Sequence, residues 1–260
     1  MLQTLRASGL LWVTGFALVA LAVLLGLGTW QWNRKTWKEE LVATIQARLK
    51  AQPIDAAAFR DLKCAHVDEV GLAASCEFTP LRLTGTFDHD NERHVYTGIA
   101  KPAGGGLGGQ GYWIVTPFRI TATGETVAVS RGFIPDSQMD IAIREKTWIQ
   151  GETTITGLIR SGEQRQTFTN ANNPKKNDWY LRNTRELFSG DIGAAITRRH
   201  LFIDLVAPTP AGGLPQPTAG RIDIPNRHLE YALTWWALAA TLLGVFGAFA
   251  AGRLRAVKSP

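Results

Sequence analysis

Two uncharged stretches stand near the ends of the sequence: LLWVTGFALVALAVLLGLGTW at residues 10–30 and YALTWWALAATLLGVFGAFAA at residues 231–251. Each has 21 residues, and a helix of about that length spans a hydrocarbon core of about 30 Å. Trp12 lies near one end of the first stretch and Trp30 near the other, where aromatic side chains prefer the membrane interface. We therefore predict a transmembrane helix at each end of the chain.

Both stretches have an alternative interpretation. The first could be a cleaved signal peptide, but its apolar run is longer than an ordinary signal core, and no small-residue cleavage site follows it in TWQWNRKTW at residues 29–37. The second could be a buried helix of a soluble protein, but it has no polar stripe to face solvent. We favour an uncleaved anchor and a second span.

The distribution of charge predicts the topology and excludes one class of partner. All 22 acidic residues and all but four of the 28 basic residues lie between positions 31 and 230, so the formal charge of +6 is not concentrated on a binding surface. We therefore expect no nucleic-acid binding. The short tail GRLRAVK at residues 252–258 is basic, which places it in the cytoplasm, whereas a long middle domain translocates largely regardless of its charge.

These arguments divide the chain into five parts. We expect a cytoplasmic N-terminus at residues 1–9, a span at 10–30, a periplasmic α+β domain at 31–230, a span at 231–251 and a cytoplasmic tail at 252–260. The nine residues before the first span are fewer than a mitochondrial transit peptide needs, which favours a multi-pass protein of a bacterial inner membrane.

The middle of the chain is rich in β-type patterns. Six runs alternate apolar and polar residues or are rich in β-formers, at residues 78–87, 94–99, 112–120, 126–134, 153–160 and 201–206. Helices are predicted at residues 36–50, shortly after Pro135 and at residues 184–189. Because no long helix alternates with the strands, we expect a mainly antiparallel sheet, either open or closed into a barrel.

The two cysteines, Cys64 and Cys76, lie close together in the sequence. In an oxidising compartment they are candidates for a disulfide. The alternative is a metal site, because Cys64 and His66 would offer a thiolate and an imidazole. No CxxC motif or methionine cluster accompanies them, so we favour the disulfide.

No catalytic set of residues stands out, so we predict that the protein is not an enzyme. Residues 106–111 match G-x-G-x-x-G, but a strand pattern follows where dinucleotide binding requires a helix, so a hairpin loop is the better interpretation. Ser130 has no nucleophile elbow around it. Asp88 and Asp90 are more typical of a turn than of an acid–base pair.

The entry to the second span offers a candidate binding site. His228, Tyr231 and Trp235 are spaced at i, i+3 and i+7, so they share one helix face, and Arg227 precedes them. A neutral imidazole can ligate haem iron, the aromatic rings can line a porphyrin edge, and Arg227 can pair with a propionate. The alternative is an aromatic belt with a histidine that only bonds to the domain above it. The residues alone favour this second interpretation.

Ordered short motifs along the whole chain resemble the surfeit-locus-one family of cytochrome c oxidase assembly proteins. They are Gly28-Thr29-Trp30-Gln31, Gly85-Thr86-Phe87, Thr116-Pro117-Phe118, Val129-Ser130-Arg131-Gly132-Phe133-Ile134-Pro135, Gly157-Leu158-Ile159-Arg160, Asn172-Asn173-Pro174, Trp179-Tyr180, Gly212-Gly213-Leu214-Pro215 and Asn226-Arg227-His228-Leu229-Glu230-Tyr231. Phe133 stands where the family pattern often has tryptophan, and the stretch from Cys64 to Cys76 is not part of that pattern.

The resemblance implies a role in the assembly of haem-copper cytochrome c oxidase. It implies binding of haem A, with His228 as the proposed ligand of the haem iron, and delivery of that haem to subunit I. Haem A synthase and the lipid bilayer are the other implied partners. The alternative is a scaffold that stabilises subunit I during assembly and binds no haem. A membrane-anchored enzyme is disfavoured because no catalytic set is present.

Overall fold

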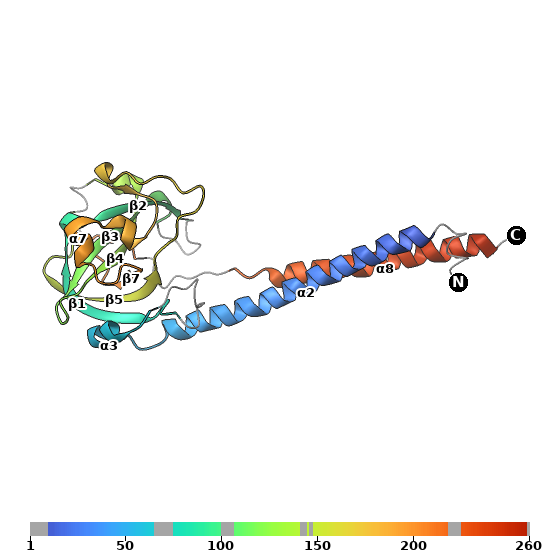
Figure 1. Ribbon diagram of the computed structural model, residues 1–260, viewed down its shortest axis with the longest axis horizontal. Helices are drawn as coiled ribbons and strands as arrows, with labels where there is room; N and C mark the ends of the chain where they lie inside the picture. The colour runs from blue at the N-terminus through green and yellow to red at the C-terminus, as the bar shows by residue number, and fades with distance from the viewer. Residues whose placement is uncertain are drawn as a thin grey trace. The chain divides into compact units, whose positions relative to one another are not determined.

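The computed structural model describes residues 10–64, 75–99, 107–140, 145, 148–217 and 225–258. The chain forms two compact units. The first combines its two ends, Met1–Ala43 and Asp223–Pro260, and the second is the domain Thr44–Ile222. Two long helices run side by side in the first unit: α2 (Leu10–Leu49), whose last turns belong to the second unit, and α8 (His228–Lys258) (Figure 1).

Both helices are long and apolar enough to cross a membrane. The predicted span at residues 10–30 and the predicted helix at residues 36–50 are one continuous helix in the structure. The residues that join them, 31–35, contain neither proline nor glycine, and Lys35 forms an ion pair with Glu39 one turn later at 2.7 Å. An i, i+4 pair of this kind stabilises a helix, so nothing in this stretch ends α2.

The least exposed positions of the two helices follow a heptad spacing. On α2 they include Thr14, Ala17, Leu21, Leu24, Gly28, Gln31, Lys35 and Lys38; on α8 they include His228, Ala232, Trp235, Ala239, Leu242 and Phe246. Steps of three and four residues are those of helices that pack at a small crossing angle. Gly28 is buried because the indole of Trp236 occupies the space that a Cβ would need. Trp236 also lies 5.9 Å from Trp32, centroid to centroid.

The described part of the domain contains a seven-stranded sheet. Its strands are β1 (Pro80–Phe87), β2 (Arg93–Ile99), β3 (Gly109–Ile120), β4 (Thr126–Pro135), β5 (Glu152–Ser161), β6 (Asp178–Trp179) and β7 (Leu201–Ala207). They bond in the order β1-β5-β7-β4-β3-β2-β6, and β1 also pairs with β3. Five strands therefore close into a ring, and β2 and β6 extend from it (Figure 1). Only β4–β7 and β2–β6 are parallel among these pairings, which confirms the mainly antiparallel prediction.

The sheet has a core on each of its faces. One core fills the ring and includes Leu83, Phe118, Val127, Val129 and Ile203. The other lies outside the ring, where residues of β2, β3, β4 and β7 meet Leu187, Phe188 and Ile196 of a short helical segment. Successive residues of β4 alternate between the two cores, because side chains along a strand point to opposite faces.

Short helices complete the described part of the domain. They are α3 (Ala56–Asp61), η1 (His89–Asn91), η2 (Asp136–Gln138), η4 (Pro174–Lys176), α6 (Thr184–Leu187) and α7 (Gly190–Ala195). Asp55 caps α3 by accepting from the backbone N–H of Ala58 at 2.8 Å, and Asn183 caps α6 through Arg185 at 3.0 Å. Such caps satisfy backbone donors that a short helix leaves open.

The structure confirms the six predicted strands and the predicted helix after residue 183. The helix predicted after Pro135 is only the single 3-10 turn η2. Asp88 precedes the turn η1 and Asp90 lies within it, so these residues form a turn as predicted. Gly109, Gln110 and Gly111 are the first residues of β3, which pairs antiparallel with β2. This half of the glycine-rich run therefore lies in a strand and not in the predicted loop, although a strand follows the run as expected. Gly106 and His66 lie outside the described residues.

Candidate functional site

The candidate site lies at the start of α8, where His228 is the first helical residue. The backbone N–H of His228 donates to the side-chain oxygen of Asn226 at 3.4 Å, and the N–H of Tyr231 donates to the carbonyl of Arg227 at 3.3 Å. These bonds fix the first turn and leave the half-buried imidazole beside α2.

Gln31 of α2 holds the imidazole from the opposite helix. Its Oε1 lies 2.7 Å from Nδ1 of His228, although the two residues are 197 positions apart in the chain. An amide oxygen accepts hydrogen bonds, so this contact favours the neutral tautomer with the proton on Nδ1 and the lone pair on Nε2. Nε2 has no hydrogen-bond partner among the described residues, which makes it the nitrogen available to a ligand.

A pocket of about 280 Å³ opens beside this histidine. Its lining comes from both helices of the unit: Lys38 of α2, and Pro225, Arg227, His228 and Tyr231 at the start of α8. Nζ of Lys38 donates to the carbonyl oxygen of Pro225 at 2.6 Å. An ammonium group has three donors, so this bond leaves two for a ligand. The pocket therefore combines one imidazole, two cationic side chains and one aromatic ring.

Three of the four predicted site residues come together here. Arg227, His228 and Tyr231 line the pocket, and Tyr231 is 54% exposed. Trp235 is half-buried but does not line it. Its neighbour Trp236 packs against Trp32 and fills the space above Gly28.

The sequence alone did not indicate Gln31 and Lys38 as site residues. Both residues lie on the same face of α2 as Gly28, among the least exposed positions of the helix, which follow a heptad spacing and which we call the heptad seam. That seam is the signal that could have found them. It becomes informative only when α8 is known to pack against α2.

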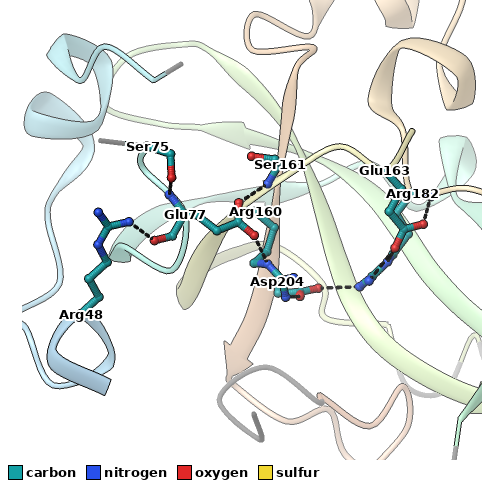
Figure 2. A network of polar contacts seen from close by, with 8 residues as sticks. All are labelled: Arg48, Ser75, Glu77, Arg160, Ser161, Glu163, Arg182 and Asp204. Carbon is teal, nitrogen blue, oxygen red and sulfur yellow. Dashed lines mark hydrogen bonds and ion pairs between the residues drawn. The ribbon is translucent and has the colours of Figure 1, made fainter. Parts of the chain in front are cut away.

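The domain holds a second group of charged residues, which is internally satisfied (Figure 2). Arg160 bonds to Glu77 at 2.7 Å and to Asp204 at 3.1 Å. Arg182 bonds to Asp204 at 3.3 Å and to Glu163 at 2.7 Å. Burial lowers the pKa of Arg182, but Asp204 and Glu163 outweigh it and raise that pKa above its usual value. Because each of these five charged side chains has at least one oppositely charged partner, we interpret this network as a structural one.

A third polar group joins β4 to the turn η1, which follows β1. Arg131 is completely buried, and its Nη1 donates to Glu92 and to Nδ1 of His89 at 3.2 Å each. Nε2 of His89 donates to the carbonyl of Ile149 at 3.0 Å, and Trp148 stacks on the imidazole with its centroid 4.8 Å away. Both ring nitrogens of His89 are therefore engaged, and this histidine is not available as a ligand.

The candidate disulfide residues are joined: Cys64 bonds to Cys76, with the two Cα atoms 5.2 Å apart. Cys76 is buried in the core of the ring, and Cys64 packs against that core. The bond therefore ties the chain before β1 to the interior of the domain. Among the described residues, no three His, Cys, Asp or Glu side chains gather as they would around a metal ion.

Comparisons with known proteins agree with the short motifs. Residues 18–240 match the SURF1 family. The chain is 33% identical over 252 residues to a SURF1-like protein of Monosiga brevicollis, covering 93% of this chain and 87% of the relative. It is 33% identical over 225 residues to Surfeit locus protein 1 of Homo sapiens, covering 83% of this chain and 70% of the human protein. Surfeit locus protein 1 of Mus musculus is 32% identical over 234 residues, covering 86% of this chain and 71% of the mouse protein.

Proposed function

This chain belongs to the SURF1 family, and we propose that it is an assembly factor for haem-copper cytochrome c oxidase that binds haem A through His228 and assists its insertion into subunit I. The family is known as one of cytochrome oxidase assembly factors, which supports the general role. The observation that carries the finer proposal is the free Nε2 of His228 at the edge of a pocket with two cations.

The donor set of the pocket fits a haem. A neutral imidazole nitrogen is an ordinary axial ligand of haem iron. Arg227 and Lys38 offer two positive charges to the two propionates, and a guanidinium can bond a carboxylate through two parallel hydrogen bonds. Tyr231 supplies an aromatic ring for the edge of the macrocycle. The pocket volume of about 280 Å³ suits one edge of a haem rather than its enclosure, because sites that enclose a small molecule measure roughly 300–1,000 Å³.

A site that holds haem by one edge suits a delivery role. Nothing in the pocket would attach haem covalently, since Cys64 and Cys76 are bonded to each other. A single histidine ligand with charged neighbours can release its cargo to a stronger site. We propose that haem A is this cargo, that subunit I receives it and that haem A synthase supplies it. No step in this role requires catalysis by the chain.

The proposed setting is a bacterial inner membrane. There α2 and α8 would cross the bilayer, with both termini in the cytoplasm and the residues between the spans in the periplasm. Two helices of sufficient length and apolar character support the crossing. The basic tail with Arg253 and Arg255 supports the cytoplasmic placement of that end.

A scaffold without haem is the second candidate. Gly244 and Gly247 of α8 have open space where a Cβ would lie, so no described residue packs against the helix at these two positions. Small residues allow another helix to approach closely in a membrane. In this role α8 would hold a helix of subunit I, and His228 would serve only to join α8 to α2.

One experiment separates the two candidates. The full chain is purified from cells that make haem A, and its optical spectrum is compared with that of His228→Ala and of His200→Ala, which changes a histidine of the other unit. Haem absorption in the wild type and in His200→Ala, with most of it lost in His228→Ala, is the expected result. Equal haem in all three proteins would remove His228 as the ligand. No haem in any of them would favour the scaffold.

A further inference from the structure

The contact between Gln31 and His228 has a consequence for the chemistry of the imidazole. Only one of the two ring nitrogens of a neutral histidine carries a proton. The acceptor Oε1 of Gln31, 2.7 Å from Nδ1, favours the tautomer with the proton on Nδ1. In the other tautomer, Nε2 would carry the proton and could not donate its lone pair to a metal.

The surrounding packing holds Gln31 in this position. Gln31 is half-buried between the two helices. The next residue, Trp32, packs against Trp236, with the two ring centroids 5.9 Å apart. One turn before it, Gly28 allows that same indole to lie against the α2 backbone. The close approach of the helices therefore fixes the distance from the Gln31 amide to the imidazole.

We propose that Gln31 is the positioning residue of the haem site: its amide oxygen fixes the tautomer and the ring orientation of His228, so that Nε2 faces the pocket. The proposal rests on the proposed function, since it assigns Gln31 a role at the same site. Histidines that ligate metals almost always donate their other N–H to an acceptor, and loss of that acceptor typically costs about 10- to 100-fold in metal affinity.

A purely structural role predicts a different outcome. If Gln31 only joins α2 to α8, its removal lowers the thermal stability of the helix pair, but each folded molecule still binds haem as the wild type does. If Gln31 positions the imidazole, its removal weakens haem binding in molecules that remain folded. An acceptor that is also an anion, such as glutamate, restores binding and adds electron density to the imidazole.

The test compares five full-length proteins in detergent: the wild type, Gln31→Leu, Gln31→Glu, His228→Ala and Gln46→Leu. Gln46 is an exposed residue of the same helix, so its substitution is the matched control. Each protein is titrated with haem A, and the dissociation constant, the absorption spectrum and the midpoint potential are measured. Circular dichroism gives the folded fraction.

We expect Gln31→Leu to bind haem A about 10- to 100-fold more weakly than the wild type, with an altered spectrum, and Gln46→Leu to bind as the wild type does. Gln31→Glu should bind within a few-fold of the wild type and have a lower midpoint potential. If Gln31→Leu does not fold, the comparison of Gln31→Glu with the wild type decides, because an unchanged potential in a haem-bound Glu variant overturns the proposal.

Wild-type affinity and spectrum in folded Gln31→Leu, together with loss of haem in His228→Ala, would overturn the role of Gln31 while leaving the proposed function intact. Haem binding that is unchanged in His228→Ala, or absent from the wild type, would overturn the proposed function first and the role of Gln31 with it. The two failures are therefore distinguished by the His228→Ala protein.

Discussion

Arg131 donates a hydrogen bond to Nδ1 of His89 over 3.2 Å at a point where the arginine side chain is completely buried. Because a guanidinium can only donate, Nδ1 of His89 must accept, and the ring proton lies on Nε2, where it is donated to Ile149. The imidazole is therefore held in its neutral form. Burial and the charge of Arg131 lower the pKa of His89 below its usual value. They outweigh the bond to Ile149 and the charges of Glu92 and Asp88, which raise it.

This lowered pKa predicts a loss of stability on acidification. Above the unfolded pKa of about 6.5 the histidine is neutral in both states, and its contribution is fully present. As the pH falls below that value, the unfolded chain binds the proton first, so the free energy of unfolding decreases until the folded pKa is reached. The measurement is the denaturant midpoint between about pH 7.5 and about pH 5.5.

The matched variant for this prediction is His89→Gln. Its amide can still accept from Arg131 and donate to Ile149, but it does not titrate. The variant should lose less stability than the wild type over the same pH interval. An equally steep loss in the two proteins would show that another group is responsible.

The charge network around Asp204 predicts a large effect of removing one carboxylate. Asp204 is only 7% exposed and bonds to both Arg160 and Arg182. In Asp204→Ala the two guanidinium groups would be left close together, each with one remaining partner, Glu77 or Glu163. We expect the free energy of unfolding to fall by about 2–3 kcal/mol, less than for a buried pair that loses its only partner.

Denaturant unfolding of the full chain in detergent measures this effect. Asp191→Ala removes an exposed aspartate and is the control, with an expected change within about 0.5 kcal/mol. Equal effects of the two substitutions would mean that the network around Asp204 contributes little to stability.

Much of the fold is visible in short-range patterns. In β1 the sequence alternates, and the structure buries Leu81 and Leu83 while it exposes Arg82 and Thr84. Such a strand is predictable because side chains along a strand point to opposite faces. The two-residue strand β6 and the six-residue helices α3 and α7 were not predicted, since a period needs more residues than these elements contain.

Only part of the candidate site can be predicted from the sequence, because some of its residues are far apart in the chain. His228, Tyr231 and Arg227 are neighbours in the sequence, so one helix start was enough to bring them together. Gln31 reaches His228 across 197 residues, and no local pattern carries that contact. Helix spacing predicts that Trp235 shares the site with His228, but a helix face about 100° wide can bury some of its residues against a neighbouring helix instead.

The disulfide predicts a difference between oxidised and reduced protein. The bond joins residues that are 12 positions apart in the sequence, and a cross-link that closes a loop of this size stabilises the folded state by about 3 kcal/mol in the chain-entropy model. The double variant Cys64→Ser/Cys76→Ser should therefore unfold at a lower denaturant concentration than the wild type. Adding a reductant should lower the wild-type midpoint toward that of the variant and leave the variant unchanged. A wild-type midpoint that does not respond to reductant would contradict the prediction.

The environment of Gly132 predicts that a single added methyl group can detach residues 216–217, near the end of the domain, from β4. Gly132 has a φ of +137°, which side chains other than hydrogen rarely allow, and a Cβ there would overlap the backbone of Gln216 and Pro217. Next to it, Phe133 and Gln216 exchange two backbone hydrogen bonds of 2.9 Å. In Gly132→Ala the backbone of residues 216–217 must move away, and both bonds are lost.

We expect Gly132→Ala to destabilise the domain by about 1–3 kcal/mol and to open the chain around Gln216 to proteases. Limited proteolysis with mass spectrometry locates the cut, and denaturant unfolding measures the stability. Gly98→Ala is the control, because Gly98 lies on β2 with open space where its Cβ would be and with no unusual φ. The control should change stability by no more than about 1 kcal/mol. If Gly132→Ala resists proteolysis as well as Gly98→Ala does, the prediction is wrong. Residues 216–217 would then stay bonded to β4, and the backbone of β4 itself would have moved to make room for the methyl group.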